Sequence, residues 1–358
     1  MHLGVVNNRY LCPMISLLAK AVTLPYAGVL WLRHACYDYG LIKSDPPAIP
    51  CLSMGNITAG GTGKTPHTEL VLRLCSQGVP VAVLSRGYGR KSKGFRYVSV
   101  DDRVADVGDE PLQIKRKFPA TVVAVHRNRM EGIQKIQRDY PIVKLVILDD
   151  AFQYRKLNPT CSILLTPYSR PFTQDTLLPF GRLRDLPTQA KRAHTIIVTK
   201  VPTTATAAMR EHQYELIKPN KNQQLLFSCY TYDPPRSLFP HTLSLAPHSA
   251  DRVIAITGVA HPEPFLTQIE KTAKVLKHLK FPDHHVFTKK DALRINALYA
   301  RYPGIPIYTT EKDALRLYET SCLSPQVQAA LYCVPIRVEL CSAREHCRFV
   351  ALIADLCR

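Results

Sequence analysis

Short apolar runs rich in valine, isoleucine and leucine recur through the first two thirds of the chain, separated by longer amphipathic stretches. Such runs are typical of strands buried on both faces of a parallel sheet. We predict strands at Cys51–Met54, Val79–Ser85, Thr121–Ala124, Val143–Leu148, Ser162–Leu165 and Thr195–Thr199. Helices are predicted at Pro66–Ser76, Glu110–Lys117 and Arg129–Arg138. This alternation indicates an α/β fold with a doubly wound, mainly parallel sheet.

The pattern changes after Asn222–Thr231, a predicted strand that leaves this sheet and precedes two prolines. A second, smaller α/β pattern follows, with strands at Arg252–Thr257, Ile305–Tyr308 and Val334–Glu339 and helices at Pro264–Ala273 and Arg348–Leu356. A proline-rich stretch at 44–50 forms an earlier boundary. We therefore expect an N-terminal apolar helical segment (1–44), a first domain (45–225) and a second α/β domain with connecting strands (226–358).

The N-terminal segment contains the apolar run ISLLAKAVTLPYAGVLWL, residues 15–32. It is about the shortest length that could cross a bilayer, where roughly 20 apolar residues are needed, and Lys20 and Pro25 interrupt it. Trp31 ends the run beside Arg33 and His34, which suits a lipid headgroup layer. One interpretation is a pair of buried helices broken at Pro25. We adopt the other, a helix associated with one leaflet of a membrane.

The charge balance indicates anionic partners. Lys and Arg number 47 against 28 Asp and Glu, a formal net charge of +19. The basic residues are spread along the chain, which disfavours nucleic acid as the partner. A mean hydropathy of −0.09 excludes a polytopic membrane protein. The 11 cysteines form no CxxC pair, which favours a reduced protein without a disulfide framework or a zinc site.

The strongest chemical signal is GNITAGGTGKT, Gly55–Thr65, between an apolar strand and an amphipathic helix. This context is typical of a P-loop, whose glycines turn backbone N–H groups toward phosphate at a helix N-terminus. Lys64 would reach the β- and γ-phosphates, and the Thr65 hydroxyl would ligate Mg²⁺. The loop is a variant, because Thr58 stands where the usual first glycine would be. We expect a P-loop NTPase-like fold with phosphates on Thr58, Ala59, Gly60, Gly61, Thr62, Gly63, Lys64 and Thr65.

Two further features complete the expected nucleotide site. Asp149 and Asp150 end an apolar strand, where a carboxylate facing the loop would hold Mg²⁺ or its waters. Thr199-Lys200-Val201 is followed by a proline, so the guanine-reading pattern [NT]-K-x-D is incomplete. We therefore expect ATP rather than GTP.

Three more constellations carry candidate chemistry. SRGYGR, residues 85–90, offers Arg86, Tyr88 and Arg90 for a sugar and an anionic group. GDEP, residues 108–111, places Asp109 and Glu110 at a helix start, where capping alone would also favour them. FPDHH, residues 281–285, places two histidines and an aspartate after a proline.

These motifs, together with LDDAFQYRKL, LLPFGRLRD, GVAHPEPF and TEKDA, occur in the order found in the tetraacyldisaccharide 4′-kinase (lipid A 4′-kinase) family. The chain resembles that family from the N-terminal apolar segment to about Leu317. It departs at Ala151 and Tyr154, where the family has the Gly and His of LDDGFQH. The family's LREP appears as Leu183–Leu186, LRDL.

The resemblance implies transfer of the γ-phosphate of ATP to the 4′-hydroxyl of a tetraacylated glucosamine disaccharide 1-phosphate, by a monomer at the cytoplasmic face of the bacterial inner membrane. It implies that Asp109 is the general base, that His284 supports it, and that Arg184 neutralises the transferring phosphate. The implied Mg²⁺ ligands are Thr65, Asp149, Asp150 and Glu110. If Asp109 and His284 both act, the active site lies between the two domains. A P-loop metallochaperone-type GTPase or ATPase is the alternative, although such proteins usually carry a CxxC motif.

Overall fold

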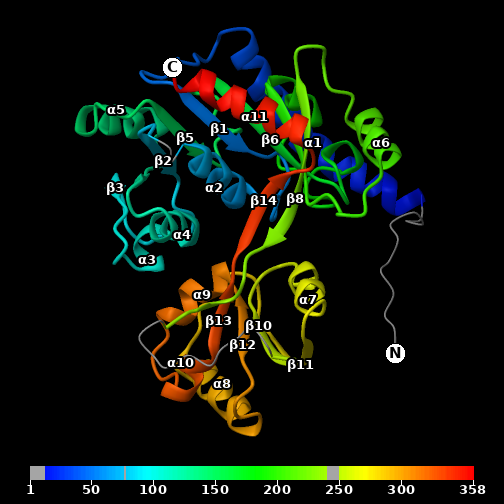
Figure 1. The fold of residues 1–358 in the computed structure, drawn as a ribbon. Coiled ribbons are helices and arrows are strands. Elements are labelled where there is room, and N and C mark those ends of the chain that lie inside the picture. The colour runs from blue at the N-terminus through cyan, green and yellow to red at the C-terminus, as the bar shows by residue number, and fades with distance from the viewer. Residues whose placement is uncertain (1–12, 76–77, 240–249) are drawn as a thin grey trace.

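The computed structural model describes residues 13–75, 78–239 and 250–358, with side chains from residue 23 onward. It folds into two lobes, each built on its own sheet (Figure 1). The first lobe contains a nine-stranded sheet in the order β14-β8-β7-β6-β1-β5-β2-β4-β3. Its strands are β1 (Cys51–Gly55), β2 (Val81–Ser85), β3 (Arg96–Tyr97), β4 (Val122–Val125), β5 (Leu145–Asp149), β6 (Cys161–Pro167), β7 (Thr195–Thr199), β8 (Gln224–Tyr232) and β14 (Ile336–Leu340).

Seven strands of this sheet are parallel, and the two edge strands β3 and β14 are antiparallel to their neighbours. The helices of the first lobe are α2 (Lys64–Cys75), α3 (Val104–Val107), α4 (Asp109–Lys117), α5 (Arg129–Asp139), α6 (Ala207–Ile217) and α11 (Ala343–Leu356). All five residues of β1, β2, β5 and β7 are buried, as the apolar runs predict. The expected doubly wound, mainly parallel α/β fold is confirmed.

The second lobe is built on a five-stranded sheet in the order β11-β10-β12-β13-β9. Its strands are β9 (Arg236–Ser237), β10 (Arg252–Thr257), β11 (Lys274–Lys280), β12 (Ile307–Thr310) and β13 (Leu331–Val334). Its helices are α7 (Glu263–Ile269), α8 (Lys289–Arg301), α9 (Glu311–Tyr318) and α10 (Pro325–Ala330). The expected second, smaller α/β unit is therefore present.

The C-terminal segment returns to the first lobe, which differs from the expected second domain of residues 226–358. The predicted strand Val334–Glu339 is divided at Pro335 into β13 and β14, and β14 pairs with β8. In Figure 1, β8 and β14 run side by side between the lobes, and α11 lies against the first lobe. The physical reason is apolar burial, because Val338 and Phe349 belong to the core of the first lobe.

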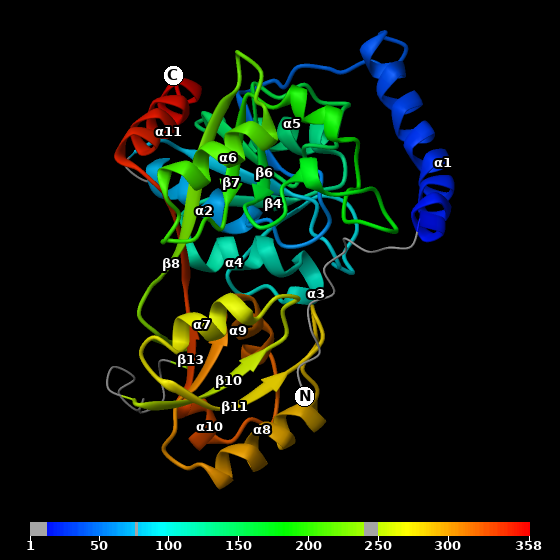
Figure 2. The ribbon, with the colours of Figure 1, turned by 90° about the vertical axis from the view of Figure 1, so that its right-hand side faces the viewer.

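Helix α1 (Pro13–Asp38) flanks the first lobe, as Figure 2 shows, and is continuous through Pro25. Its C-terminal half is tied to that lobe by polar contacts: the Tyr26 hydroxyl donates to the Arg184 carbonyl at 3.1 Å, and His34 Nε2 lies 2.6 Å from Asp185 Oδ1. The alternative interpretation, a pair of buried helices broken at Pro25, is not what the structure has. Large apolar side chains of α1 remain exposed, namely Leu24, Val29, Trp31 and Leu32. Within the described ranges, no helix has the length and apolar character to span a membrane.

Candidate active site

The glycine-rich loop between β1 and α2 is braced by the neighbouring strand β7. Gly60 and Gly63 have φ of +103° and +92°, a backbone region that favours glycine. Thr199 at the end of β7 donates its hydroxyl to the Thr62 carbonyl at 2.9 Å, and Lys200 Nζ donates to the Gly61 carbonyl at 2.6 Å. The loop is therefore a preformed cradle with backbone N–H groups at the start of α2.

The first half of the loop forms a short antiparallel bridge with residues 182–184. Thr58 pairs with Leu183, the Ala59 amide donates to the Arg182 carbonyl at 2.6 Å, and the Arg184 amide donates to the Ile57 carbonyl at 2.9 Å. Thr58 has no positive φ, so this variant loop needs no glycine there. The bridge also places the Arg184 side chain over the loop.

Lys64 and Arg184 converge on Asp150. Lys64 Nζ lies 3.8 Å from Asp150 Oδ2, and Arg184 Nη1 donates to the same oxygen at 3.2 Å. Arg184 Nη2 pairs with Asp150 Oδ1 and with the Asn56 side chain. Burial alone would raise the pKa of Asp150, but the charges of Lys64 and Arg184 hold it below its ordinary value. The Lys64 and Arg184 side chains are therefore held beside the glycine-rich loop.

Asp149, at the end of β5, differs from Asp150 because its pKa is raised rather than lowered. It is only 4% exposed, accepts a 3.4 Å hydrogen bond from Ser85, and leaves Oδ1 without a hydrogen-bond partner. Burial raises its pKa to about 6, with Asp150 and Glu110 adding to the shift and Lys64 opposing it. A buried carboxylate oxygen without a partner is a natural ligand for a cation.

The donor set fits Mg²⁺ held jointly with nucleotide phosphates. Across residues 13–75, 78–239 and 250–358, no group of three or more His, Cys, Asp or Glu is placed to hold a metal by itself. Mg²⁺ usually takes one or two carboxylates together with substrate phosphates and waters. Asp149 and Asp150 would supply the carboxylates of such a site, and Thr65 lies in the first turn of α2.

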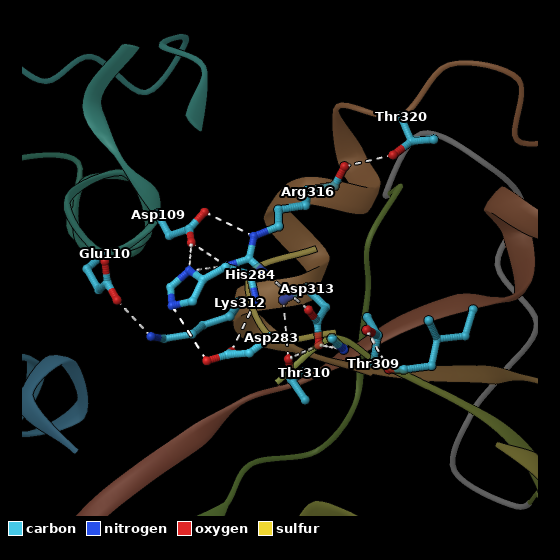
Figure 3. Close-up of polar contacts among 12 residues, drawn as sticks. Asp109, Glu110, Asp283, His284, Thr309, Thr310, Lys312, Asp313, Arg316 and Thr320 are labelled. Carbon is cyan, nitrogen blue, oxygen red and sulfur yellow. Dashed lines mark hydrogen bonds and ion pairs between the residues drawn. The ribbon is translucent and has the colours of Figure 1, made fainter. Parts of the chain in front are cut away.

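The two lobes meet at Asp109, the first residue of α4 (Figure 3). His284 Nδ1 lies 3.0 Å from Asp109 Oδ2, although the two residues are 175 positions apart. Arg316 of α9 donates from Nε to Asp109 Oδ1 at 3.1 Å and from an Nη to Oδ2. Burial alone would raise the pKa of Asp109, but hydrogen bonds from His284 and Arg316 and the Arg316 charge lower it to about 2. The hydrogen bond to Asp109 raises the pKa of His284.

Glu110, the next residue of α4, pairs with Lys312 of α9 at 2.7 Å (Figure 3). Lys312 therefore forms an ion pair with the Glu110 carboxylate, which the sequence analysis expects to bind Mg²⁺. Glu110 also adds to the raised pKa of Asp149. Burial lowers the pKa of Lys200, and the charges of Arg182 and Lys312 add to this shift, so the charges of α4 and α9 act on the loop site.

The SRGYGR loop is divided between an exposed and an internal part. Arg86 and Tyr88 are exposed, and the Tyr88 ring lies 6.3 Å from the His284 ring, centroid to centroid. Arg90 instead donates to Ser92 Oγ at 3.2 Å and to the Gly94 carbonyl at 2.5 Å. The Arg86 and Tyr88 side chains are therefore accessible to a ligand, whereas the hydrogen bonds of Arg90 stabilise its own loop.

Sequence reasoning left Lys312 and Arg316 without roles. The signal was present, since TEKDALR places these two cations one helical turn apart on the same face. Their targets Glu110 and Asp109 could not be read from local pattern, because each pair joins residues about half the chain apart.

A phosphate cradle, two adjacent aspartates and an Asp–His pair at one lobe boundary are typical of a P-loop phosphotransferase. Residues 15–355 match the family model described as LpxK, tetraacyldisaccharide-1-P 4′-kinase. The chain belongs to this family.

Comparison with individual proteins supports the same family. The chain is 39% identical over 338 residues to the tetraacyldisaccharide 4′-kinase of Phocaeicola vulgatus, covering 92% of this chain and 90% of the relative. It is 37% identical to that of Bacteroides thetaiotaomicron over 88% of this chain and 86% of the relative. Its fold is similar to the crystal structure of LpxK from Aquifex aeolicus in complex with ATP, with a TM-score of 0.70 and 24% identity over 95% of this chain and 100% of that chain.

Proposed function

We infer that the protein transfers the γ-phosphate of ATP to the 4′-hydroxyl of a tetraacylated glucosamine disaccharide 1-phosphate, a step of lipid A biosynthesis. One observation carries the assignment within the molecule: Asp109 and His284 meet at 3.0 Å at the boundary of the lobes, near the cradle with Lys64, Asp149 and Asp150. A hydrolase or a metallochaperone has no need for such a pair at the acceptor side of the loop.

The nucleotide side of the site follows from the cradle. The loop amides and Lys64 hold the β- and γ-phosphates and stabilise the charge that develops during transfer. To reach the phosphates, Lys64 has to leave Asp150, from which it lies 3.8 Å away. Thr65, Asp149 and Asp150 would hold Mg²⁺, and Glu110 could join them only after releasing Lys312. Bound there, Mg²⁺ neutralises charge on the phosphate oxygens.

The acceptor side follows from Asp109. Its low pKa keeps it ionised at neutral pH, so it can accept the proton of the 4′-hydroxyl. A modest base is sufficient because the transition state of phosphoryl transfer is loose. His284 supports the carboxylate, and Arg184 neutralises the transferring phosphate. Arg86 and Tyr88, which are exposed, would contact the sugar and its phosphate, and Arg90 would hold their loop in shape.

The acyl chains of the acceptor call for a lipid surface, and α1 offers one. Its Leu24, Val29, Trp31 and Leu32 side chains are all exposed. We propose that α1 lies in one leaflet at the cytoplasmic face of the bacterial inner membrane and that the enzyme acts there as a monomer.

The test is an incubation of the protein with γ-labelled ATP, Mg²⁺ and a tetraacylated disaccharide 1-phosphate in detergent. The expected product is a labelled, lipid-extractable bisphosphate, and Lys64→Ala should abolish it. Release of free phosphate without a lipid-borne product would overturn the proposed kinase and favour the nucleotide-hydrolase alternative.

A further inference from the structure

The second lobe presents two cations to the first turn of α4. Lys312 and Arg316 lie one turn apart on α9 and pair with Glu110 and Asp109, respectively (Figure 3). Arg316 is the more deeply placed of the two and is only 6% exposed. A guanidinium with so little access to solvent is held by its partners in a fixed orientation.

The contacts of Arg316 and His284 leave the Asp109 carboxylate with one direction in which it can accept a further hydrogen bond. A carboxylate accepts hydrogen bonds in about four directions. Arg316 occupies one on each oxygen, from Nε and from an Nη, and His284 Nδ1 lies 3.0 Å from Oδ2. The remaining direction is on Oδ1, which is where an acceptor hydroxyl can donate its proton.

Arg316 also contacts the imidazole of His284. Arg316 Nη2 lies 3.1 Å from His284 Nδ1, and this imidazole nitrogen in turn lies 3.0 Å from Asp109 Oδ2. A protonated Nδ1 donates to Asp109, and an unprotonated Nδ1 accepts from Arg316. Both states of the imidazole therefore have a partner, and the ring keeps its orientation in either state.

A closed set of hydrogen bonds fixes Arg316 and His284 as one unit. Arg316 Nη1 lies 3.4 Å from Asp313 Oδ1, and Asp313 Oδ2 accepts from the Gly258 amide at 2.8 Å. The Gly258 carbonyl in turn accepts from the His284 amide at 3.2 Å. A Cβ on Gly258 would lie 2.9 Å from Asp313 Oδ1, so this close approach requires glycine. GVAHPEPF, FPDHH and TEKDA thus meet in one structural unit.

We propose that Arg316 is a positioning residue for the transfer reaction, which holds both oxygens of Asp109 and one nitrogen of His284 and so fixes the lone pair that faces the acceptor hydroxyl. This inference rests on the kinase function proposed above. Because Arg316 and His284 belong to one hydrogen-bonded unit of the second lobe, Asp109 is aligned only when the lobes are together.

The test compares wild-type protein, Arg316→Ala, Arg316→Lys and the exposed-surface control Arg301→Ala in the lipid phosphorylation assay. For Arg316→Ala we expect a fall in kcat of about 10²-fold, the order that a misplacement of about 1 Å can cost, with KM for ATP near the wild-type value. Arg316→Lys should recover only part of the rate, because an ammonium cannot hold both oxygens. Millimolar guanidinium should raise the rate of Arg316→Ala and leave Asp109→Asn unchanged.

The double variant Asp109→Asn/Arg316→Lys gives a second criterion that does not need Arg316→Ala to fold. If Arg316 acts through Asp109, the double variant is no slower than Asp109→Asn alone. Multiplying losses, or a wild-type kcat for Arg316→Lys, would overturn the positioning role while the wild type remains active. An inactive wild type in the same assay would instead overturn the kinase function itself.

Discussion

Asp109, Asp149 and Asp150 carry the same side chain in three different surroundings. Two cations beside Asp150 and two hydrogen-bond donors on Asp109 lower the pKa of these carboxyls, whereas burial raises that of Asp149 to about 6. In the proposed mechanism, Asp149, whose Oδ1 has no hydrogen-bond partner, would bind the cation, and Asp109, held by His284 and Arg316, would accept the proton.

Asp109→Asn separates a catalytic role of Asp109 from a purely structural one at the start of α4. The change removes the proton-accepting oxygen but keeps the shape, so kcat should fall by about 10²–10⁴-fold with a smaller change in KM. If Asp109 serves only as the first residue of α4, the change is nearly harmless, because Gly108 is the N-cap and no side chain caps this helix. The measurement is kcat at saturating ATP and lipid acceptor. A wild-type rate would remove Asp109 from the mechanism.

The sequence predicts residues whose neighbours are local. Lys64, Thr65 and the glycines are recognisable because strand, loop and helix follow one another without interruption, and Asp149 and Asp150 because they end a buried strand. The resemblance supplied Asp109 and His284 as partners. Arg316 could not be paired with Asp109 in this way, since 207 positions separate them and only tertiary packing brings them together.

At the scale of elements, helix α8 has a complete N-terminal cap. Thr288 Oγ1 accepts from the Asp291 amide at 3.3 Å, and Asp291 Oδ2 accepts from the Thr288 amide at 2.8 Å and from its hydroxyl at 2.7 Å. His285 Nε2 lies 3.0 Å from the same oxygen. This cap fixes the helix directly after the loop that carries His284.

The cap predicts an acid-sensitive contribution to stability. Partial burial would raise the pKa of Asp291, but hydrogen bonds from Thr288 and His285 lower it to about 2 from 3.8. A lowered folded-state pKa contributes stability above about pH 4 that is lost as the pH falls toward 2. Wild-type protein should therefore lose about 1–2 kcal/mol more than Asp291→Asn between pH 5 and pH 2. Urea unfolding across this range is the measurement, and equal losses would contradict the assignment.

Helix α1 combines an anchored face with an exposed apolar one. Deleting it would also remove the Tyr26 and His34 contacts to the segment that carries Arg184, so deletion tests two effects at once. The double variant Val29→Ser/Trp31→Ser changes only exposed side chains. We expect weaker sedimentation with anionic lipid vesicles and unchanged ATP affinity. The control is Met209→Ser on α6, and vesicle binding equal to that of the control would argue against an interfacial α1.

The positions of β14 and α11 could not be predicted from periodicity. The strand–helix alternation correctly separates the first and second lobes, but β14 and α11 read as a continuation of the second α/β pattern. Their pairing with β8 and their burial beside α2 depend on non-local contacts that periodicity does not report.

At the scale of the molecule, Lys117 of α4 links the two lobes. Its Nζ lies 2.6 Å from Glu69 of α2 and 2.7 Å from Glu311 of α9. Glu311 also accepts from the Ile336 amide at 3.1 Å, where β14 begins. Burial raises the pKa of Glu69 to about 7, and the nearby Glu311 adds to this shift, while Lys117 opposes it.

Lys117→Met should therefore remove the cation between these two acidic groups and leave Glu69 with only the longer 3.8 Å ion pair to Arg73. We expect a loss of about 3 kcal/mol in the free energy of unfolding. Adding Glu69→Gln to the same variant should recover part of this loss, because it removes one of the two acidic charges. Denaturant unfolding of both variants measures the effect, and an unchanged midpoint for Lys117→Met would show that the link contributes nothing.

The return of β14 and α11 to the first lobe has a consequence for how the protein is made. Val338 and Phe349 share one apolar core with Leu52 of β1 and Leu70 of α2. On the ribosome, the phosphate loop emerges long before these two residues, and its lobe stays incomplete until they have been added. The second lobe, whose last strand β13 ends at Val334, lies between β8 and β14 in the sequence. The lobe that begins first in the sequence is therefore the last to receive all of its core residues.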